Sequence, residues 1–351
     1  PIEWQQQSAL LAWADYWATG STDLAVAYWS TLLNNTMAQF RDGTGVVGPV
    51  KIARPMGHGN HIVGWDPAPN VTQFVTSDHQ TPCNAYALAG LRVLAELARA
   101  AGTTAKAAMV ATAASQLSAA MMAKLWDPIA DRFCDGICSE VGGHKSVYSD
   151  ATTLALGLVP ESARPTVWKA IAAHGLEGIG DYGAFLYLKA LATWPEEVLD
   201  DGGPILTALT KCDATSWCAE WEQWNATMTM EAFPLAAGDL TSFAHPWGTA
   251  ALAGVVQGML GITATSPGFS TFTVRPRLGG LASASLRLPT LYGYVEVTAS
   301  PTRLELAVPC NTRARACLYA AAVRSGSEPG ELRLDGAPVD VVREGPHVCT
   351  A

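Results

Sequence analysis

The chain has 351 residues, of which 49% are hydrophobic and 15% are charged. This length is enough to bury a large core, and the composition excludes an intrinsically disordered protein. The net charge is -9, and the 22 lysines and arginines are scattered without a cluster, which argues against binding to a nucleic-acid backbone.

The longest charge-free stretch, residues 245–274, is interrupted by glycines and a proline. A membrane-spanning helix needs about 20 predominantly apolar residues, so we expect a buried helix followed by a turn here, and no membrane span. The sequence starts with Pro1 and shows no secretory signal at its beginning. We therefore expect it to begin partway through a longer precursor.

The first 262 residues show helical periodicity repeatedly. Ser21 or Thr22 can cap a helix that runs towards Leu33, and Thr81 with Pro82 is a good N-cap and first-turn pair for the next long helix. Further helices are expected at residues 105–125, 149–158, 165–173, 185–192, 205–209 and 249–260. Such a series, joined by loops with glycine and proline, predicts a mainly α domain, a helical toroid or bundle, with the site in loops at one end.

After residue 262 the periodicity changes from helical to alternating. Leu304, Leu306 and Val308 alternate with polar residues, and Asp335 with Gly336 marks a hairpin turn between two short runs. We therefore expect residues 263–351 to form an all-β domain of antiparallel strands, most simply a sandwich.

Eight cysteines form an even set. Local bridges are expected between Cys134 and Cys138 and, next to the candidate site, between Cys212 and Cys218, while Cys349 can pair with Cys310 or Cys317. Buried free thiols are the alternative. Bridges and three N-x-T sequons, at Asn34, Asn70 and Asn225, favour a secreted protein. No zinc ligand spacing, cofactor fingerprint or metalloprotease motif occurs, so neither a metal nor a cofactor is expected.

Three carboxylates lie close together in residues 215–233. Glu231 is bracketed by Met230 and Phe233, and an apolar setting favours a carboxyl group suited to proton transfer. Glu220 and Glu222 are two residues apart, so they cannot share a helix face, and at least one is expected in solvent or a loop. A helix-terminal structural glutamate is the alternative for Glu231.

Aromatic residues accompany these carboxylates. Trp217 and Trp224 can form walls of a sugar subsite, because an aromatic ring matches the C–H face of a pyranose, or they can be core residues. His245, at the head of an apolar helix, can donate to a substrate hydroxyl or simply cap that helix. Trp65 and Asp66, in a loop with glycine and proline, are further candidates for substrate contact.

These residues resemble the α-L-rhamnosidases of glycoside hydrolase family 78. Ser216 and Trp217 look like the family's Ser-Trp pair, and ATMTME at residues 226–231 matches its A-T-x-x-x-E pattern in register. His245 falls at the family's histidine, LGI at residues 260–262 at its helix end, and PGFSTFTVRPRLGGL, from Pro267, resembles the start of its C-terminal β-sandwich.

The resemblance implies an (α/α)6-type toroid over residues 1–262, here short of its first helices, and a β-sandwich over residues 263–351. It implies an inverting glycosidase acting on rhamnose-containing carbohydrate, with Glu231 as general base and with Glu220 and Glu222 in the preceding loop. The family's acidic motif with the general acid is not found in these residues, so we expect it in an N-terminal part of the same polypeptide.

Substrate contacts are expected from Trp65, Asp66, Trp217, Trp224 and His245. The family often carries a sugar-binding carboxylate one residue before the tryptophan; here this carboxylate is either displaced to Asp66 or lost. The alternative is a non-catalytic glycan-binding or structural protein that kept this fold. A polysaccharide lyase is less favoured, because the chain lacks clustered arginines to neutralise a uronate.

Overall fold

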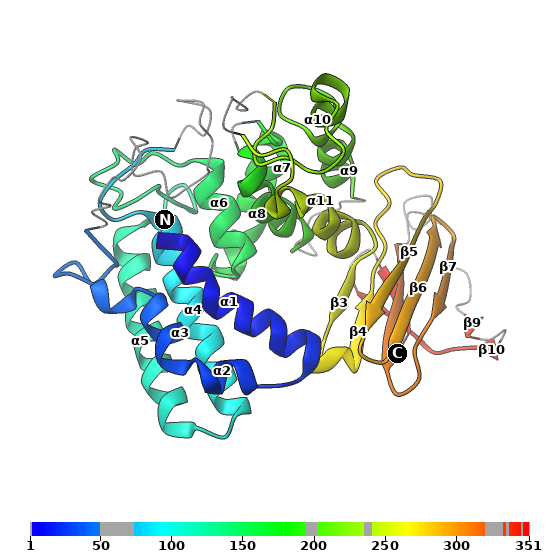
Figure 1. The fold of residues 1–351 in the computed structure, drawn as a ribbon, viewed down its shortest axis with the longest axis horizontal. Helices are drawn as coiled ribbons and strands as arrows, with labels where there is room; N and C mark the ends of the chain where they lie inside the picture. The colour runs from blue at the N-terminus through cyan, green and yellow to red at the C-terminus, as the bar shows by residue number, and fades with distance from the viewer. Residues whose placement is uncertain are drawn as a thin grey trace.

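The computed structural model describes residues 2–49, 74–177, 179–193, 202–234, 241–319, 333–334, 337–344 and 347–350. Within these, a helical domain precedes a β domain (Figure 1). The helices are α1 (Ile2–Thr19), α2 (Asp23–Ala27), α3 (Trp29–Asn35), α4 (Thr81–Ala100), α5 (Thr104–Lys124), α6 (Val147–Ala155), α7 (Arg164–His174), α8 (Gly180–Ala192), α9 (Gly203–Thr210), α10 (Trp217–Trp224) and α11 (Ala250–Ala253).

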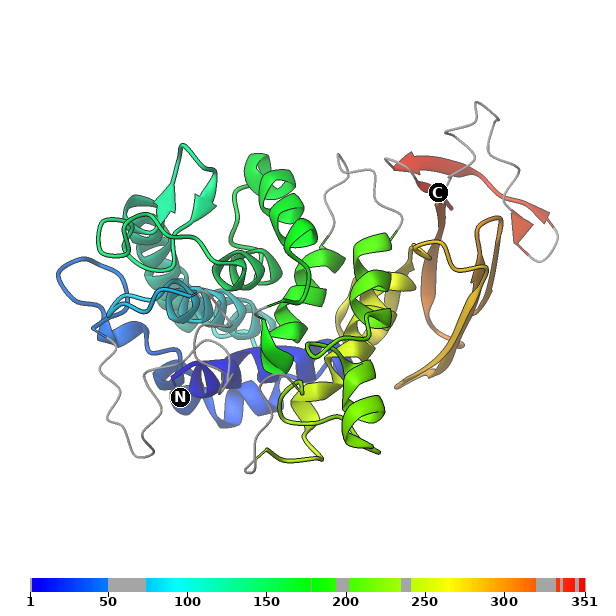
Figure 2. The ribbon, with the colours of Figure 1, turned by 90° about the horizontal axis from the view of Figure 1, so that it is seen from above.

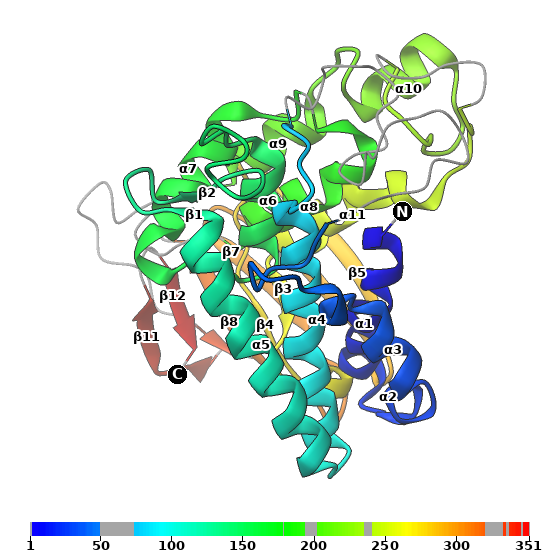
Figure 3. The same ribbon diagram turned by 90° about the vertical axis from the view of Figure 1, so that its left-hand side faces the viewer.

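The helical domain is built from inner helices that alternate with outer ones. In sequence order α1, α4, α6, α8 and α11 are the inner helices, and each packs against the next. The outer helices α2 and α3, α5, α7 and α9 lie in the connections between them (Figures 1 and 3). This is the (α/α) hairpin arrangement that the sequence predicts.

Small residues let the inner helices approach closely. Gly90 of α4 faces α1 and the end of α3, where an added Cβ would lie 3.1 Å from Thr36 and 3.6 Å from Ala9. Almost every residue in the first half of α4 is buried. A helix that is buried all round belongs in the middle of a large core, which confirms the inner position of α4.

Several predicted helices differ in detail. The helix expected from Thr22 to Leu33 is interrupted at Tyr28, which separates α2 from α3. Gln80, not Thr81, occupies the N-cap of α4, because the Thr81 hydroxyl donates to the Cys134 carbonyl. The helix expected at 249–260 is a 3-10 turn (Pro246–Thr249), α11 and a π-helical turn (Gly254–Met259).

Two larger sheets make up most of the described part of the β domain. β11 (Val341–Glu344), β12 (His347–Thr350), β8 (Arg313–Tyr319), β4 (Thr271–Val274) and β3 (Ile262–Ala264) form one, and β5 (Ala284–Thr290), β6 (Gly293–Ser300) and β7 (Arg303–Ala307) form the other. Phe272 and Val274 of the first sheet and Val295 and Val297 of the second share one buried cluster. The sheets therefore pack face to face, as in a sandwich (Figure 2).

One feature of this domain corrects the sequence prediction. All strands were expected to be antiparallel, but β4 and β8 pair in parallel, with Thr271 opposite Arg313. Parallel neighbours need a long connection, and β5, β6 and β7 lie between β4 and β8 in the sequence. The hairpin predicted at Asp335 and Gly336 agrees with the antiparallel pairing of β9 (Arg333–Leu334) and β10 (Ala337–Pro338); the two turn residues lie outside the described part of the chain.

Candidate active site

The N-terminal ends of three inner helices meet at one end of the helical domain. Trp4 of α1 contacts Trp247, which precedes α11, with ring centroids 5.9 Å apart. Tyr182, at the start of α8, contacts the same indole at 5.2 Å, and the Gln7 amide of α1 donates to the Tyr182 hydroxyl. Three segments that are distant in the sequence thus form one partly exposed aromatic surface.

The starts of the other two inner helices are joined by Asp135, which is fully buried. Its backbone carbonyl accepts the Thr81 N–H of α4 at 2.8 Å, and its Oδ1 accepts the Ser146 N–H that precedes α6 at 2.9 Å. Oδ1 also accepts the hydroxyls of Ser146 and Ser149, both at 2.7 Å. The helix starts carry partial positive charge, so a carboxylate is well placed there.

Glu231 lies on a short segment, residues 229–231, that pairs with the residues before Trp247. The Glu231 N–H donates to the Ser242 carbonyl at 2.9 Å, and the His245 N–H to the Thr229 carbonyl at 2.9 Å. Glu231 is partly exposed, and its carboxylate Oε2 accepts the Ser242 N–H at 2.9 Å. Hydrogen bonds therefore hold the backbone around Glu231, while part of the residue is open to solvent.

The same segment brings His245 to the aromatic surface. The His245 ring lies over Trp247, with centroids 3.8 Å apart, and the Trp247 indole N–H donates to the Glu231 carbonyl at 2.7 Å. The structure thus brings together the two residues, Glu231 and His245, that the sequence singled out. It adds Trp4, Tyr182 and Trp247, which have no common sequence signal because they come from three separate helix starts.

Glu220 differs from its sequence prediction. It was expected in a loop, but it lies in the first turn of α10 and is 1% exposed, whereas Glu222 is exposed. The Ser216 side chain caps this helix by accepting the Ala219 N–H. The helix turns Glu220 inward beneath the Glu231 segment, where its Oε2 accepts the Met230 N–H at 3.0 Å.

The other predicted contact residues have different positions. Trp217 is buried and packs edge-on against Phe233. Its indole N–H donates to the Gly248 carbonyl at 2.7 Å. This position favours a core residue over the wall of a sugar subsite. Trp224 is 37% exposed and contacts Phe243, with ring centroids 5.6 Å apart. Trp65 and Asp66 lie outside the described residues.

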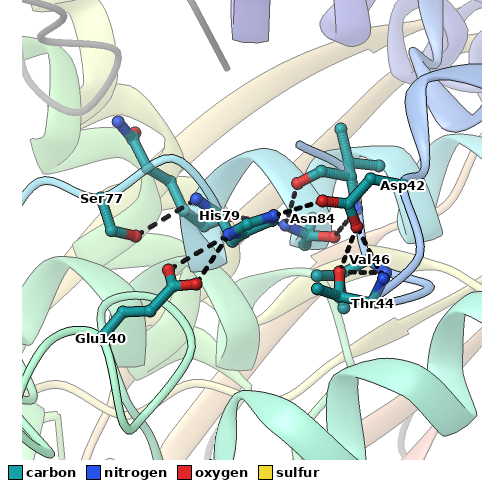
Figure 4. Close-up of polar contacts among 9 residues, drawn as sticks. Asp42, Thr44, Val46, Ser77, His79, Asn84 and Glu140 are labelled. Carbon is teal, nitrogen blue, oxygen red and sulfur yellow. Dashed lines mark hydrogen bonds and ion pairs between the residues drawn. The ribbon is translucent and has the colours of Figure 1, made fainter. Parts of the chain in front are cut away.

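A second polar cluster lies before α4 (Figure 4). His79 bridges two carboxylates: its Nε2 is 2.9 Å from Asp42, and its Nδ1 is 3.1 Å from both oxygens of Glu140. Burial by itself lowers the pKa of His79, but the bonds to Asp42 and Glu140 outweigh it, so the pKa is raised. The Thr44 hydroxyl and His79 lower the pKa of Asp42 to about 2.

Three cysteine pairs lie at disulfide distance. They are Cys134 with Cys138, Cys212 with Cys218, and Cys317 with Cys349, with Cα atoms 5.3, 4.9 and 4.0 Å apart. The second pair, which the sequence predicts, would tie the start of α10 to the preceding turn. For Cys349, the register of β12 against β8 selects Cys317, while Cys310 is exposed.

In the part of the chain that the structure describes, no group of three or more histidine, cysteine, aspartate or glutamate side chains could hold a metal ion. Within the same residues, no helix is both long and apolar enough to cross a membrane.

Comparison of the whole fold gives a consistent set of solved structures. The α-L-rhamnosidase from Dictyoglomus thermophilum superposes with a TM-score of 0.77 and 15% identity, over 99% of this chain and 38% of that one. The Streptomyces avermitilis α-L-rhamnosidase complexed with L-rhamnose superposes with a TM-score of 0.66 and 19% identity, over 97% of this chain and 32% of that one. For the Aspergillus terreus α-L-rhamnosidase the TM-score is 0.67 and the identity 18%, over 90% of this chain and 36% of that one.

These likenesses define a protein with an (α/α) hairpin glycosidase domain and a C-terminal β domain. Residues 1–256 match the bacterial α-L-rhamnosidase six-hairpin glycosidase domain, and residues 261–333 match the bacterial α-L-rhamnosidase C-terminal domain. The chain belongs to this family. It spans about a third of the length of the solved relatives, from 32% to 38%, and comparison with curated protein sequences gives no match.

Proposed function

We propose that this chain forms the catalytic and C-terminal domains of a glycoside hydrolase that removes terminal α-L-rhamnosyl residues, with Glu231 as the general base. The position of Glu231 carries the proposal. It is a partly exposed carboxylate on a hydrogen-bonded segment, beside an aromatic surface formed by three inner-helix starts. Aromatic rings stack on sugar C–H faces, and a fixed carboxylate can deprotonate a water.

His245 and Trp224 are the proposed sugar contacts among the described residues. His245 is partly exposed and held over Trp247, so its ring can reach a sugar hydroxyl. Trp224 ends α10 and is 37% exposed, so we propose that its ring face contacts the group that rhamnose is attached to. Trp65 and Asp66 remain proposals from the sequence alone.

We further propose that the reaction inverts the anomeric configuration. Inversion requires a water between base and sugar, which places the two catalytic carboxyl groups about 6.5 to 9.5 Å apart. The general acid must reach the glycosidic oxygen. Asp181 and Glu220, which are 0% and 1% exposed, cannot do so, and we propose that the acid lies on polypeptide outside these 351 residues.

The test is hydrolysis of an aryl α-L-rhamnoside by the chain expressed with whatever its gene encodes ahead of Pro1. We expect release of β-L-rhamnose as the first product, seen by proton NMR before mutarotation. Release of α-L-rhamnose would contradict inversion. Binding of L-rhamnose without hydrolysis by this polypeptide would instead support the alternative of a non-catalytic glycan-binding protein.

An extracellular location is also proposed. The three cysteine pairs at disulfide distance suit an oxidising compartment. Counting free thiols in the denatured protein, with and without prior reduction, tests this. Recovery of all eight cysteines as thiols without reduction, in protein isolated from its native source, would contradict it.

A further inference from the structure

Two carboxyl groups meet beneath the Glu231 segment, and the proposed catalytic step uses neither. Asp181 belongs to the first turn of α8 and Glu220 to the first turn of α10. They are 0% and 1% exposed, and their carboxyl groups lie within hydrogen-bonding reach of each other. We call these two residues the carboxyl pair.

The carboxyl pair has few donors. The Met230 N–H donates to Glu220 Oε2 at 3.0 Å, but neither Asp181 oxygen, nor Glu220 Oε1, receives a normal N–H or O–H hydrogen bond from a described residue. The Trp217 indole N–H donates to the Gly248 carbonyl at 2.7 Å, and it also lies close enough to Asp181 to lower the pKa of this carboxyl group, although burial raises it more. Two ionised carboxylates can only accept hydrogen bonds, so a hydrogen bond between Asp181 and Glu220 would require a proton on one of them.

Among the described residues, the charged groups on the elements packed around Asp181 do not supply a hydrogen-bond donor to the carboxyl pair. The sequences of α9, α11 and the π-helical turn (Gly254–Met259) contain no charged or titratable side chain. On α7, Lys169 and His174 are exposed, and Arg164 is partly so. From α6 the Tyr148 hydroxyl lies against Gly183, which follows Asp181 by two residues on α8. Towards Glu231, the titratable groups are Glu231 itself and His245.

The carboxyl pair is packed directly against the backbone that carries Glu231. Glu220 holds the N–H of Met230, the residue before Glu231. On the other side, a Cβ on Gly248 would lie 2.7 Å from the Met230 carbonyl and 2.8 Å from Asp181 Oδ2. Met230 itself is 0% exposed. A displacement of Glu220 would therefore be passed directly to Met230 and on to the next residue.

We propose that Asp181 and Glu220 share one proton, and that this carboxyl pair is the positioning unit that fixes the Glu231 segment. Asp181 donates the proton and Glu220 accepts it together with the Met230 N–H. The positioning role for catalysis rests on the proposed function of Glu231, whereas the shared proton and the fixed backbone do not.

The physical setting supports retention of a proton. Burial, and then the charge of Glu220, raises the pKa of Asp181 to about 8, and burial raises the pKa of Glu220 to about 7. Two buried carboxylates in contact cannot both ionise without a large cost. Because these groups titrate as one unit, the shared proton belongs to the pair.

Two measurements test the pair without any activity. Infrared difference spectra of the wild type minus Asp181→Asn, at pH 7, should show the C=O band of one protonated carboxylic acid; absence of this band overturns the shared proton. Hydrogen exchange followed by mass spectrometry should show faster exchange of the peptide containing Met230 in Glu220→Ala but not in Asp181→Asn. Unchanged exchange in Glu220→Ala overturns the positioning role.

Kinetics then extend the test to the reaction. Asp181→Asn keeps a donor to Glu220, so kcat should stay within about twofold of wild type, whereas Asp181→Leu and Glu220→Ala should lower kcat roughly 10-fold or more with a much smaller change in KM. Glu222→Gln is the matched control, because this exposed residue lies on the same helix and should change neither parameter.

The outcomes separate the two proposals. Equal loss of kcat in Asp181→Asn and Asp181→Leu, or full activity of Glu220→Ala, overturns the role of the pair in an active enzyme. If the wild type hydrolyses no rhamnoside, the proposed function fails, and the infrared band and the exchange of the Met230 peptide still decide the proton and the positioning.

Discussion

The indole N–H of Trp247 donates to the backbone carbonyl of Glu231 at 2.7 Å. Because the Glu231 N–H donates to the Ser242 carbonyl at 2.9 Å, the peptide units on both sides of the Glu231 Cα are anchored. The Met230 N–H, one peptide unit earlier, is held by Glu220. A general base has to be held within a fraction of an ångström of its water. This double anchoring gives a physical reason why a short irregular segment can carry such a group.

Trp247→Phe should remove the bond to the Glu231 carbonyl while keeping most of the ring contacts with Trp4, Tyr182 and His245. A neutral hydrogen bond is worth about 0.5–1.5 kcal/mol, so we expect kcat to fall roughly 2- to 12-fold if this bond holds the base in place. The matched control is Trp221→Phe, since Trp221 is 50% exposed on α10. Equal kcat values for the two variants would show that the bond has no positioning role.

Glu231→Gln should lower kcat on an aryl α-L-rhamnoside by roughly 10²- to 10⁴-fold. The amide keeps the size of the side chain and can still accept from Ser242, but it cannot take a proton from water. Binding of L-rhamnose, measured by calorimetry, should be retained, and Glu222→Gln should behave as wild type. An undiminished rate for Glu231→Gln would move the base to another carboxylate.

Gly248→Ala should destabilise the protein and displace the Glu231 segment. The new Cβ would lie 2.7 Å from a backbone oxygen and 2.8 Å from Asp181 Oδ2, in a buried site that cannot yield freely. Overpacking of this kind costs about 1–3 kcal/mol, which thermal unfolding would detect. Gly43→Ala is the control, because nothing lies within 4 Å of its added Cβ, and it should leave the melting temperature unchanged.

The carboxyl pair should make the protein less stable as the pH rises from about 4 through 8. The native pKa values of Asp181 and Glu220, about 8 and about 7, lie above the ordinary values of 3.8 and 4.5, so the native state binds more protons than the unfolded state in this window. In Asp181→Asn this decline should be shallower. Denaturant titrations at pH 5 and pH 8 measure how far the free energy of unfolding falls between these two pH values. An equal fall in the wild type and the variant would contradict the prediction.

The His79 bridge should stabilise the protein most between about pH 4 and 6. The raised pKa of His79 means that its stabilising contribution is present below the unfolded value of 6.5 and is lost as the pH rises through the higher folded value. The contribution of Asp42 is lost in acid, as the pH falls from about 3.8 towards its folded pKa of about 2. His79→Gln should therefore lower the melting temperature more at pH 5.5 than at pH 8.5. A loss of the same size at both pH values would mean that the charge of His79 does not matter.

Much of the fold follows from local sequence pattern. Apolar residues at helical spacing predicted α4 and α5, and the change to alternation near Thr263 predicted strands from a point one residue after the start of β3. These patterns can be recognised in the sequence because burial of one face of a helix or strand makes apolar residues recur at the period of that element. Glu231 and His245 were singled out from the sequence because they match the motif of the family that the chain resembles, and their roles are proposals.

What lies beneath Glu231 was decided by tertiary structure alone. Nothing in the spacing of Asp181 and Glu220 links them, and Glu220 appeared to belong to a loop until the Ser216 cap and α10 turned it inward. The parallel pairing of β4 with β8 was hidden for the same reason. Periodicity reports which face of an element is buried, but the partner that this face meets depends on how distant elements pack, and here that packing brings two carboxyl groups into one desolvated site.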